Sequence, residues 1–190
     1  MAESLLGYIS PTAKSADDRS RRFVPRFGLY AGAAIAVFYL APSEYLLEPL
    51  LAALAMAVGA LARAVGVDAI VSGSLVVVPG NFGIEIVVEC SGVPELLLFL
   101  SAVLAYPASG KSRVAGAMIA IAGVMVGNIV RLAALFLIGV HALEYFDPVH
   151  AYVQGILSYI LMVVLWLGWL HLSAPTSYTD HKPAKRQAFG

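Results

Sequence analysis

The chain consists of long apolar segments separated by short polar ones. A helix needs about 20 mostly apolar residues to cross about 30 Å of hydrocarbon, and several of these segments reach or approach that length. The pattern therefore predicts an all-α polytopic membrane protein, a helix bundle with about four spans and one or two interfacial or re-entrant helices. The apolar segments cover residues 23–41, 44–66, 94–106, 113–141 and 151–172.

Residues 67–88 depart from this pattern. β-branched residues gather there in short runs, Pro79, Gly80 and Asn81 supply turn chemistry, and Glu85 interrupts the apolar sequence. Unpaired strand backbone is not tolerated against lipid, because nothing there can bond its N–H and C=O groups. We therefore expect a small β-hairpin that lies in water or is covered by protein.

Charged residues beside the apolar segments indicate their orientation. Three arginines lie just before the first segment, and the loop 107–113 contains Lys111 and Arg113 but no acidic residue. Short cytoplasmic loops carry an excess of lysine and arginine. We therefore place the N-terminus, this loop and the basic C-terminus in the cytoplasm. The alternative is an N-terminus outside, against this charge rule.

These placements predict where each crossing lies. If residues 94–106 run from outside to inside, Cys90 and the hairpin lie on the extracytoplasmic side. The first segment already brings the chain outside, so residues 44–66 must begin and end there, as an interfacial or re-entrant helix and not a span. The four expected crossings are residues 23–41, 94–106, 113–131 and 151–172.

The same count predicts three parts of the chain. Residues 1–22 form a cytoplasmic N-terminal tail, residues 23–172 a single membrane-embedded catalytic domain, and residues 173–190 a cytoplasmic C-terminal tail. We place the domain in the cytoplasmic (inner) membrane, as a multi-pass protein.

Three chemically active side chains meet at the outer face in this topology. Cys90 precedes one span and His150 precedes the last. Arg131 lies about 27 Å along its helix from Arg113, near the opposite face, and residues 132–140 continue as a short apolar helix. A thiol, a guanidinium and an imidazole can together attack a carbonyl, stabilise the oxyanion and protonate the leaving group. We therefore expect a catalytic site on the extracytoplasmic face.

Four further residues are expected to support this site. Glu89, Ser91 and Gly92 flank the cysteine at a helix N-terminus, whose dipole favours a thiolate. Asn128 stands one turn before Arg131 and shares its helical face, where an amide can orient the arginine or bind a peptide carbonyl.

The three candidate catalytic residues also have simpler interpretations. A lone cysteine such as Cys90 is often a small buried hydrophobe, and Arg131 can extend to the lipid headgroups. His150 can cap the last helix. His141 also lies near the outer face and competes with His150 as the proton carrier.

Composition narrows the classes of function. Hydrophobic residues make up 60% of the chain and charged residues 13%, with a formal net charge of zero, so no nucleic-acid surface is expected. One cysteine cannot form an internal disulfide or a thiolate metal cage, and the four histidines show no paired ligand spacing. We therefore expect neither a metal site nor a cofactor.

The sequence around these residues resembles the exosortase/archaeosortase family of membrane-embedded cysteine transpeptidases, in a short form. The resemblance lies in VVECSGV (87–93), in GNIVRLAALFLIG (127–139), and in His150 with Gly155 shortly after. It covers about half of the chain, while the N-terminal region lacks the extra helices of larger members.

This resemblance implies a catalytic set and a substrate. Cys90 would be the nucleophile, Arg131 the stabiliser of the thiolate or transition state, and His150 the general acid and base. The substrates would be membrane-anchored exported proteins with a C-terminal tripartite signal, made of a short motif, a transmembrane helix and a basic cluster. Cleavage would pass through a thioacyl intermediate, and a lipid or cell-surface glycan would accept the new C-terminus.

Two other classes of function stay open at this point. One is a non-catalytic membrane scaffold or transporter subunit, in which Cys90 would be replaceable. The other is a different membrane cysteine acyltransferase that acts on lipid-linked donors.

Overall fold

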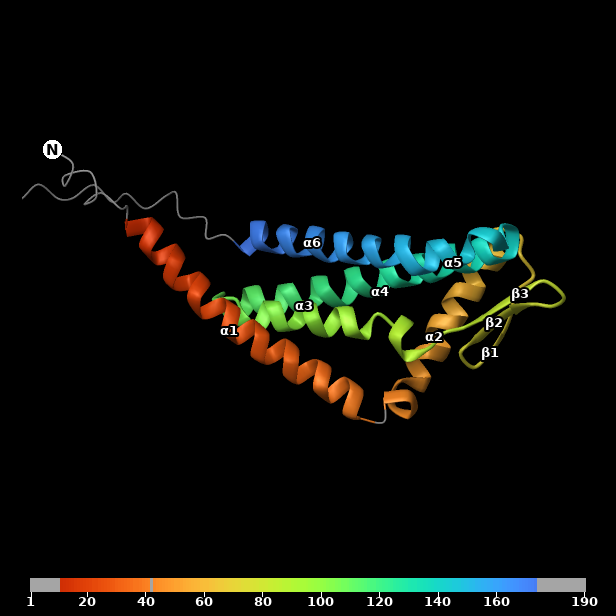
Figure 1. The fold of residues 1–190 in the computed structure, drawn as a ribbon, viewed down its shortest axis with the longest axis horizontal. Helices are drawn as coiled ribbons and strands as arrows, with labels where there is room; N and C mark the ends of the chain where they lie inside the picture. The colour runs from red at the N-terminus through yellow and green to blue at the C-terminus, as the bar shows by residue number, and fades with distance from the viewer. Residues whose placement is uncertain (1–10, 42, 174–190) are drawn as a thin grey trace, which may run out of the picture.

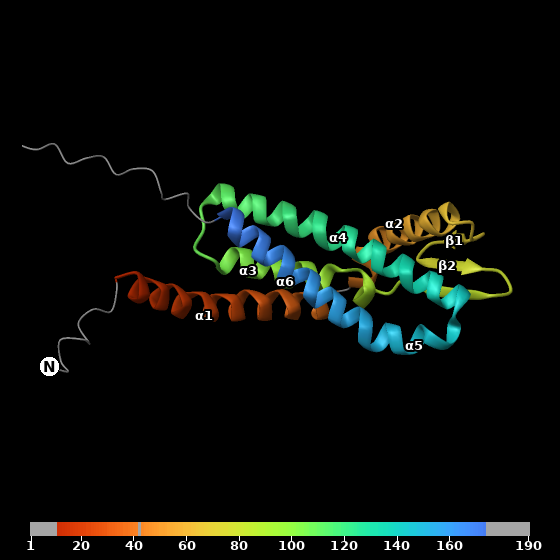
Figure 2. The same cartoon turned by 90° about the horizontal axis from the view of Figure 1, so that it is seen from above.

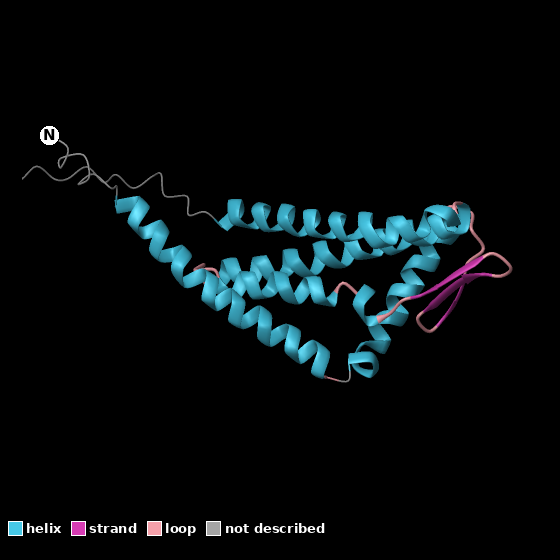
Figure 3. Cartoon of the chain, viewed as in Figure 1, coloured by secondary structure: helices cyan, strands magenta, loops and turns pink. Residues whose placement is uncertain are grey.

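The computed structural model describes residues 11–41 and 43–173, and helices dominate this part of the chain (Figure 3). The prediction of an all-α polytopic membrane protein is confirmed. The helices are α1 (Pro11–Leu40), α2 (Ser43–Ala64), α3 (Val93–Ala105), α4 (Gly110–His141), the short α5 (Phe146–Pro148) and α6 (Gln154–Ser173), and the strands are β1 (Ile70–Ser72), β2 (Leu75–Val78) and β3 (Phe82–Glu85).

Among the described residues, four helices are long and apolar enough to cross a membrane. They are Arg22–Leu40 in α1, Tyr45–Ala64 in α2, Gly110–His141 in α4 and Gly155–Ser173 in α6. The number agrees with the prediction, but the members differ. By length α2 qualifies, although residues 44–66 were not expected to span, and α3 does not, although residues 94–106 were expected to cross.

The short length of α3 has a local cause. Gly92 at its start adopts a left-handed φ of 79°, and Pro107 follows Tyr106 at its end, where proline disfavours helix in the preceding residue. The 13 residues between these breaks rise about 20 Å, less than the hydrocarbon thickness of about 30 Å.

The direction of α2 separates it from the other long helices. In Figure 1, α3, α4 and α6 run side by side, and α2 is steeply inclined to them beyond the start of α3. It packs against α4, the sheet and the turn before α3. This direction is the one expected of a helix that begins and ends on the same side, even though its length alone would permit a crossing.

The helix α4 is a single element of 32 residues, about 48 Å long. No break follows Arg131, which lies ten residues before the final His141, and the remainder continues in line as part of the same helix. α2 and β3 pack against α4. The segment 132–140 is therefore the C-terminal third of α4 and not a separate short helix.

Two apolar cores lie along α4. One fills the space between α2, the sheet and the C-terminal part of α4, and includes Val58, Val76 and Phe136. The other joins α3, α6 and the N-terminal part of α4 around Phe99 and Trp169. The turn that carries the cysteine connects the two regions of the fold.

The segment expected to be one hairpin contains three antiparallel strands in the order β1-β2-β3. The turn at Pro79 and Gly80 is where we predicted it: Gly80 has a φ of 74°, and the N–H of Asn81 donates to the carbonyl of Val78 at 3.0 Å. The additional turn uses Gly73, whose φ is 57°. A two-residue loop of this kind needs a positive φ, which glycine adopts without strain.

The sheet rests on the C-terminal end of α4. A Cβ at Gly139 would collide with the ring of Phe82, so glycine allows this close approach. The Phe82 ring also lies 6.2 Å from that of Phe136 and 5.0 Å from that of Phe146. These contacts fix β3 beside α4 and α5.

The other end of the bundle collects three chain segments. The start of α1, the connection from α3 to α4 and the end of α6 lie together there (Figure 2). This arrangement is consistent with placing the N-terminal arginines and the loop 107–113 on one side. α1 begins at Pro11, so residues 11–22 of the expected N-terminal tail are helical. Residues 1–10 and 174–190 lie outside the described residues.

Candidate active site

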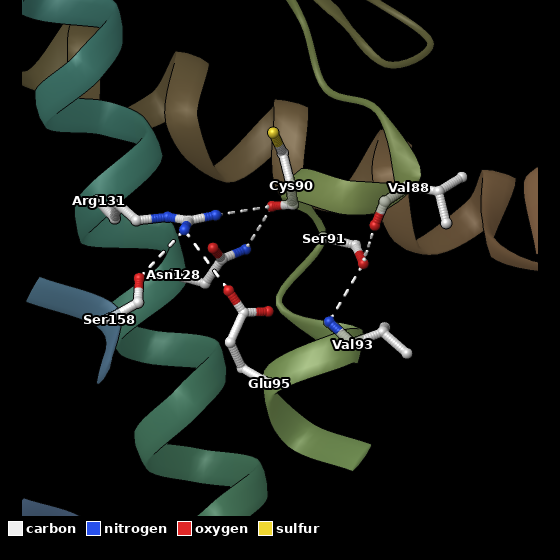
Figure 4. A network of polar contacts seen from close by, with 8 residues as sticks. All are labelled: Val88, Cys90, Ser91, Val93, Glu95, Asn128, Arg131 and Ser158. Carbon is white, nitrogen blue, oxygen red and sulfur yellow. Dashed lines mark hydrogen bonds and ion pairs between the residues drawn. The ribbon is translucent and has the colours of Figure 1, made fainter. Parts of the chain in front are cut away.

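Cys90 ends a 3₁₀ turn, η1 (Val88–Cys90), between the sheet and α3. The hydroxyl of Ser91 donates to the carbonyl of Val88 at 2.6 Å and accepts from the N–H of Val93 at 3.1 Å (Figure 4). Gly92 then turns the chain into α3, and a Cβ there would come within 3.1 Å of the Asn128 side chain. Ser91 and Gly92 thus shape the loop that holds the thiol.

Two side chains of α4 hold the carbonyl oxygen of Cys90. The Nδ2 of Asn128 donates to it at 3.0 Å, and an Nη of Arg131 donates to it at 3.4 Å (Figure 4). The predicted sharing of one helical face is confirmed by these contacts. The backbone of the cysteine is therefore fixed by donors from a helix distant in sequence.

Arg131 also joins the cysteine turn to two other helices. Its Nη1 donates to the hydroxyl of Ser158 in α6 at 3.1 Å and lies 3.6 Å from Oε1 of Glu95 in the first turn of α3. Its side chain is 16% exposed and that of Glu95 is 20% exposed, so both charges are largely removed from water. A buried charge of this kind needs a partner, which Glu95 supplies.

Glu95 and Ser158 were missed by the sequence analysis. Glu95 could have been identified from the sequence, because an acidic residue within an apolar helix is costly unless it has a partner. The sequence does not mark Ser158 as a site residue, since a serine in a membrane helix commonly bonds its own backbone.

The sulfur of Cys90 points away from the contacts made by its carbonyl (Figure 4). Burial raises the pKa of the thiol above its ordinary value, the positive charge of Arg131 partly lowers it, and the negative charges of Glu89 and Glu95 raise it further. These shifts favour the neutral thiol over the thiolate that was expected from the position of Cys90. Glu89 is exposed and acts on the thiol through its charge.

His150 lies in a π-helical turn, η3 (Val149–Val153), just before α6. Its ring stacks on that of Phe146, with centroids 5.7 Å apart and planes 12° apart. A cavity of about 270 Å³ beside β3 is lined by both Cys90 and His150. His141, the competing histidine, is exposed at the end of α4 and is not among the residues that line this cavity.

A second cavity, of about 560 Å³, lies between the start of α3, α4 and α6. Its polar lining consists of Glu95, Asn128, Arg131 and Ser158, and most of the remaining wall is aliphatic. Arg131 lines this apolar cavity, whereas Cys90 and His150 line the smaller one beside the sheet. The three predicted catalytic residues therefore gather around one turn but face two cavities.

Comparison with protein-family models gives a match. Residues 26–172 match the family model described as Transmembrane exosortase (Exosortase_EpsH). No curated protein and no solved structure matches the chain. The matched range covers more than three quarters of the sequence and includes the cysteine turn and both cavities.

Proposed function

Because the chain belongs to the transmembrane exosortase family and is a multi-pass membrane protein, we propose that it is a protein-sorting cysteine transpeptidase. It cleaves the C-terminal tripartite signal of exported, membrane-anchored proteins and transfers them to a cell-surface acceptor. The observation that carries this proposal is the shared cavity of Cys90 and His150, beside a turn whose carbonyl Arg131 holds.

The first half of the reaction forms a thioester. His150 takes the proton of the Cys90 thiol, and the sulfur attacks the carbonyl carbon of the scissile peptide bond. The oxyanion collapses, the C–N bond breaks, and His150 returns the proton to the leaving amine. The raised pKa of Cys90 favours a mechanism in which a base in the same cavity takes the proton of the thiol.

The second half transfers the acyl group. The acceptor, a hydroxyl or amine of a lipid or glycan, loses its proton to His150 and attacks the thioester carbon. The C–S bond then breaks, and the sulfur recovers the proton from His150. The protein is left as it began, with no cofactor consumed.

Arg131 has two roles in this proposal. Its charge already lowers the pKa of Cys90 in part, so it lies close enough to favour the negative charge that develops during attack. Together with Asn128 it also holds the cysteine backbone in place.

The apolar cavity between α4 and α6 suits the part of the substrate that stays in the membrane. A substrate anchored by its own helix in the same bilayer reaches the site at a high effective concentration. We place the thiol on the extracytoplasmic side of the cytoplasmic membrane, where exported proteins present their signals.

The test is processing of an exported reporter that carries a tripartite C-terminal signal from the same genome. Cys90→Ala is expected to abolish processing while the protein still inserts and accumulates. Normal processing by this variant would end the proposal and favour a scaffold or transporter subunit. Arg131→Lys is expected to lower processing by roughly tenfold, since lysine keeps the charge but loses the planar fork that reaches several partners at once.

The acyl group on Cys90 separates this proposal from a lipid-dependent acyltransferase. Mass spectrometry of the intermediate trapped with the reporter should show a peptide attached to the sulfur. A fatty acyl group at that position would instead show that the donor is a lipid.

A further inference from the structure

The sheet ends in an open strand beside the site. β3 pairs with β2 along one edge, and within residues 11–41 and 43–173 no strand pairs with its other edge. The cavity that Cys90 and His150 share is also lined by every residue from 82 to 87. Since successive strand residues point to opposite faces, a cavity lined by all of them follows the strand edge and not one face.

The register shows which backbone groups face this edge. The N–H of Ile86 donates to the carbonyl of Ser74 at 3.0 Å, and alternate residues of an antiparallel strand bond to the same partner. Ile84 therefore bonds towards β2, while Gly83 and Glu85 direct their N–H and C=O groups to the open edge. Both of these residues are exposed.

An open strand edge is a template for another extended chain. We propose that β3 binds the substrate segment that precedes the scissile bond, as an added strand running parallel to β3. This inference rests on the proposed transpeptidase function and assigns the peptide-binding surface of that site. It requires no side chain of a particular type on the substrate, because backbone groups supply the hydrogen bonds.

The parallel direction follows from the order of the site along the chain. β3 runs towards Cys90, which lies five residues beyond Glu85. A parallel peptide therefore has its C-terminal end at the thiol, with its preceding residues beside the sheet. The residues after the scissile bond then continue towards the apolar cavity between α4 and α6, where a membrane helix can follow.

Proline at position 85 tests the backbone contact. Glu85→Pro removes the outward N–H and the carboxylate, whereas Glu85→Ala removes the carboxylate alone, and the bonds of β3 to β2 are untouched in both. Processing of the reporter by the proline variant should fall about fivefold or more below that of the alanine variant, the size of one lost hydrogen bond. Equal processing by the two variants, at whatever level, would overturn strand addition.

A photo-crosslink tests the contact without relying on activity. Benzoylphenylalanine replaces Glu85 in the Cys90→Ala background, and the control places it at Ile70 in β1, which is 55% exposed on the same sheet. We expect the reporter to crosslink at position 85, through residues on the N-terminal side of the cleavage position. Equal yields at 85 and 70, or crosslinks only C-terminal to the cleavage position, would contradict the inference.

The two experiments separate this inference from the proposed function. A crosslink at position 85 with a reporter that wild-type protein never cleaves would leave peptide binding in place and reject the transpeptidase. Cleavage by the wild type, without a crosslink and with equal proline and alanine variants, would reject strand addition alone.

Discussion

At the scale of single residues, Cys90 is held by its carbonyl oxygen and not by its sulfur. Asn128 and Arg131 both donate to that oxygen, which leaves the thiol on the side of the cavity that His150 shares. The fixed backbone limits where the sulfur can point. A thiol whose pKa is raised needs a proton acceptor before its sulfur can attack a carbonyl.

The raised pKa of Cys90 predicts how its alkylation depends on pH. Only the thiolate reacts with a small haloacetamide. The alkylation rate should therefore rise by about tenfold per pH unit until the pH reaches the pKa, and this rise should continue beyond about pH 8.5, the ordinary pKa of a cysteine. Arg131→Gln should slow the reaction at a given pH, since the charge that lowers the pKa is lost, and Glu89→Gln should quicken it. A rate that levels off below pH 8 would contradict this prediction.

Glu95 is predicted to stabilise the fold through Arg131. Glu95→Gln removes the carboxylate that pairs with a largely buried guanidinium, and should lower the free energy of unfolding by about 1–3 kcal/mol. The matched control, Glu89→Gln, changes an exposed carboxylate and should stay within about 0.5 kcal/mol of wild type. The unfolding midpoint in detergent measures both, and equal midpoints would argue against the ion pair.

At the scale of elements, α4 and α6 are close at one end and separated at the other. The indole Nε1 of Trp169 donates to the carbonyl of Ser112 at 2.8 Å, and a Cβ at Gly116 would lie 2.7 Å from the same indole. Farther along, the long side chain of Arg131 bridges to Ser158, and the apolar cavity opens between the helices. The close packing of α4 and α6 around Trp169 thus holds the two helices in place where the apolar cavity separates them near Arg131.

This packing makes Gly116 sensitive to substitution. Gly116→Ala should displace the fully buried ring of Trp169 and destabilise the protein by about 1–3 kcal/mol, despite the better helix propensity of alanine. Gly168→Ala is the matched control in α6, because a Cβ there meets nothing within 4 Å, and it should be neutral or slightly stabilising. Thermal unfolding in detergent compares the two, and an equal effect would show that the indole can move aside.

The elements also show what the sequence could reveal. Helix positions and the turn at Pro79 and Gly80 were predictable, because apolar length and turn chemistry are local properties. The extra strand was missed because Gly73 was not recognised as a turn. The contacts of Glu95 and Ser158 with Arg131 depend on how three helices pack, which no local pattern encodes.

At the scale of the whole molecule, the prediction succeeded in placing Cys90, Arg131 and His150 around one turn. The count of crossings placed them together because each was assigned to the same end of its segment, although α3 is shorter than a span and α4 continues for ten residues beyond Arg131. The apolar length of α2 does not decide whether this helix crosses the membrane. The inclination of a helix depends on the elements that it packs against and not on its own sequence.

The direction of α2 can be tested by labelling single cysteines in a Cys90→Ser background. Tyr45 and Val65 lie near its two ends and are 81% and 64% exposed. If α2 lies across the bundle, Tyr45→Cys and Val65→Cys both react with a membrane-impermeant maleimide added outside intact cells. Lys111→Cys should react only after the membrane is opened. Reaction of only one α2 position from outside would show that α2 spans.

The two cavities around the cysteine turn have a consequence for the order of events. Under the proposed chemistry, the cleaved membrane helix departs through the apolar cavity, the acyl peptide stays on β3, and an acceptor can approach the thioester past the exposed His150. The acceptor and the departing helix then use different openings, and the acceptor can bind before the cleaved helix has left. The thioester is exposed to water for less time, which favours transfer over hydrolysis.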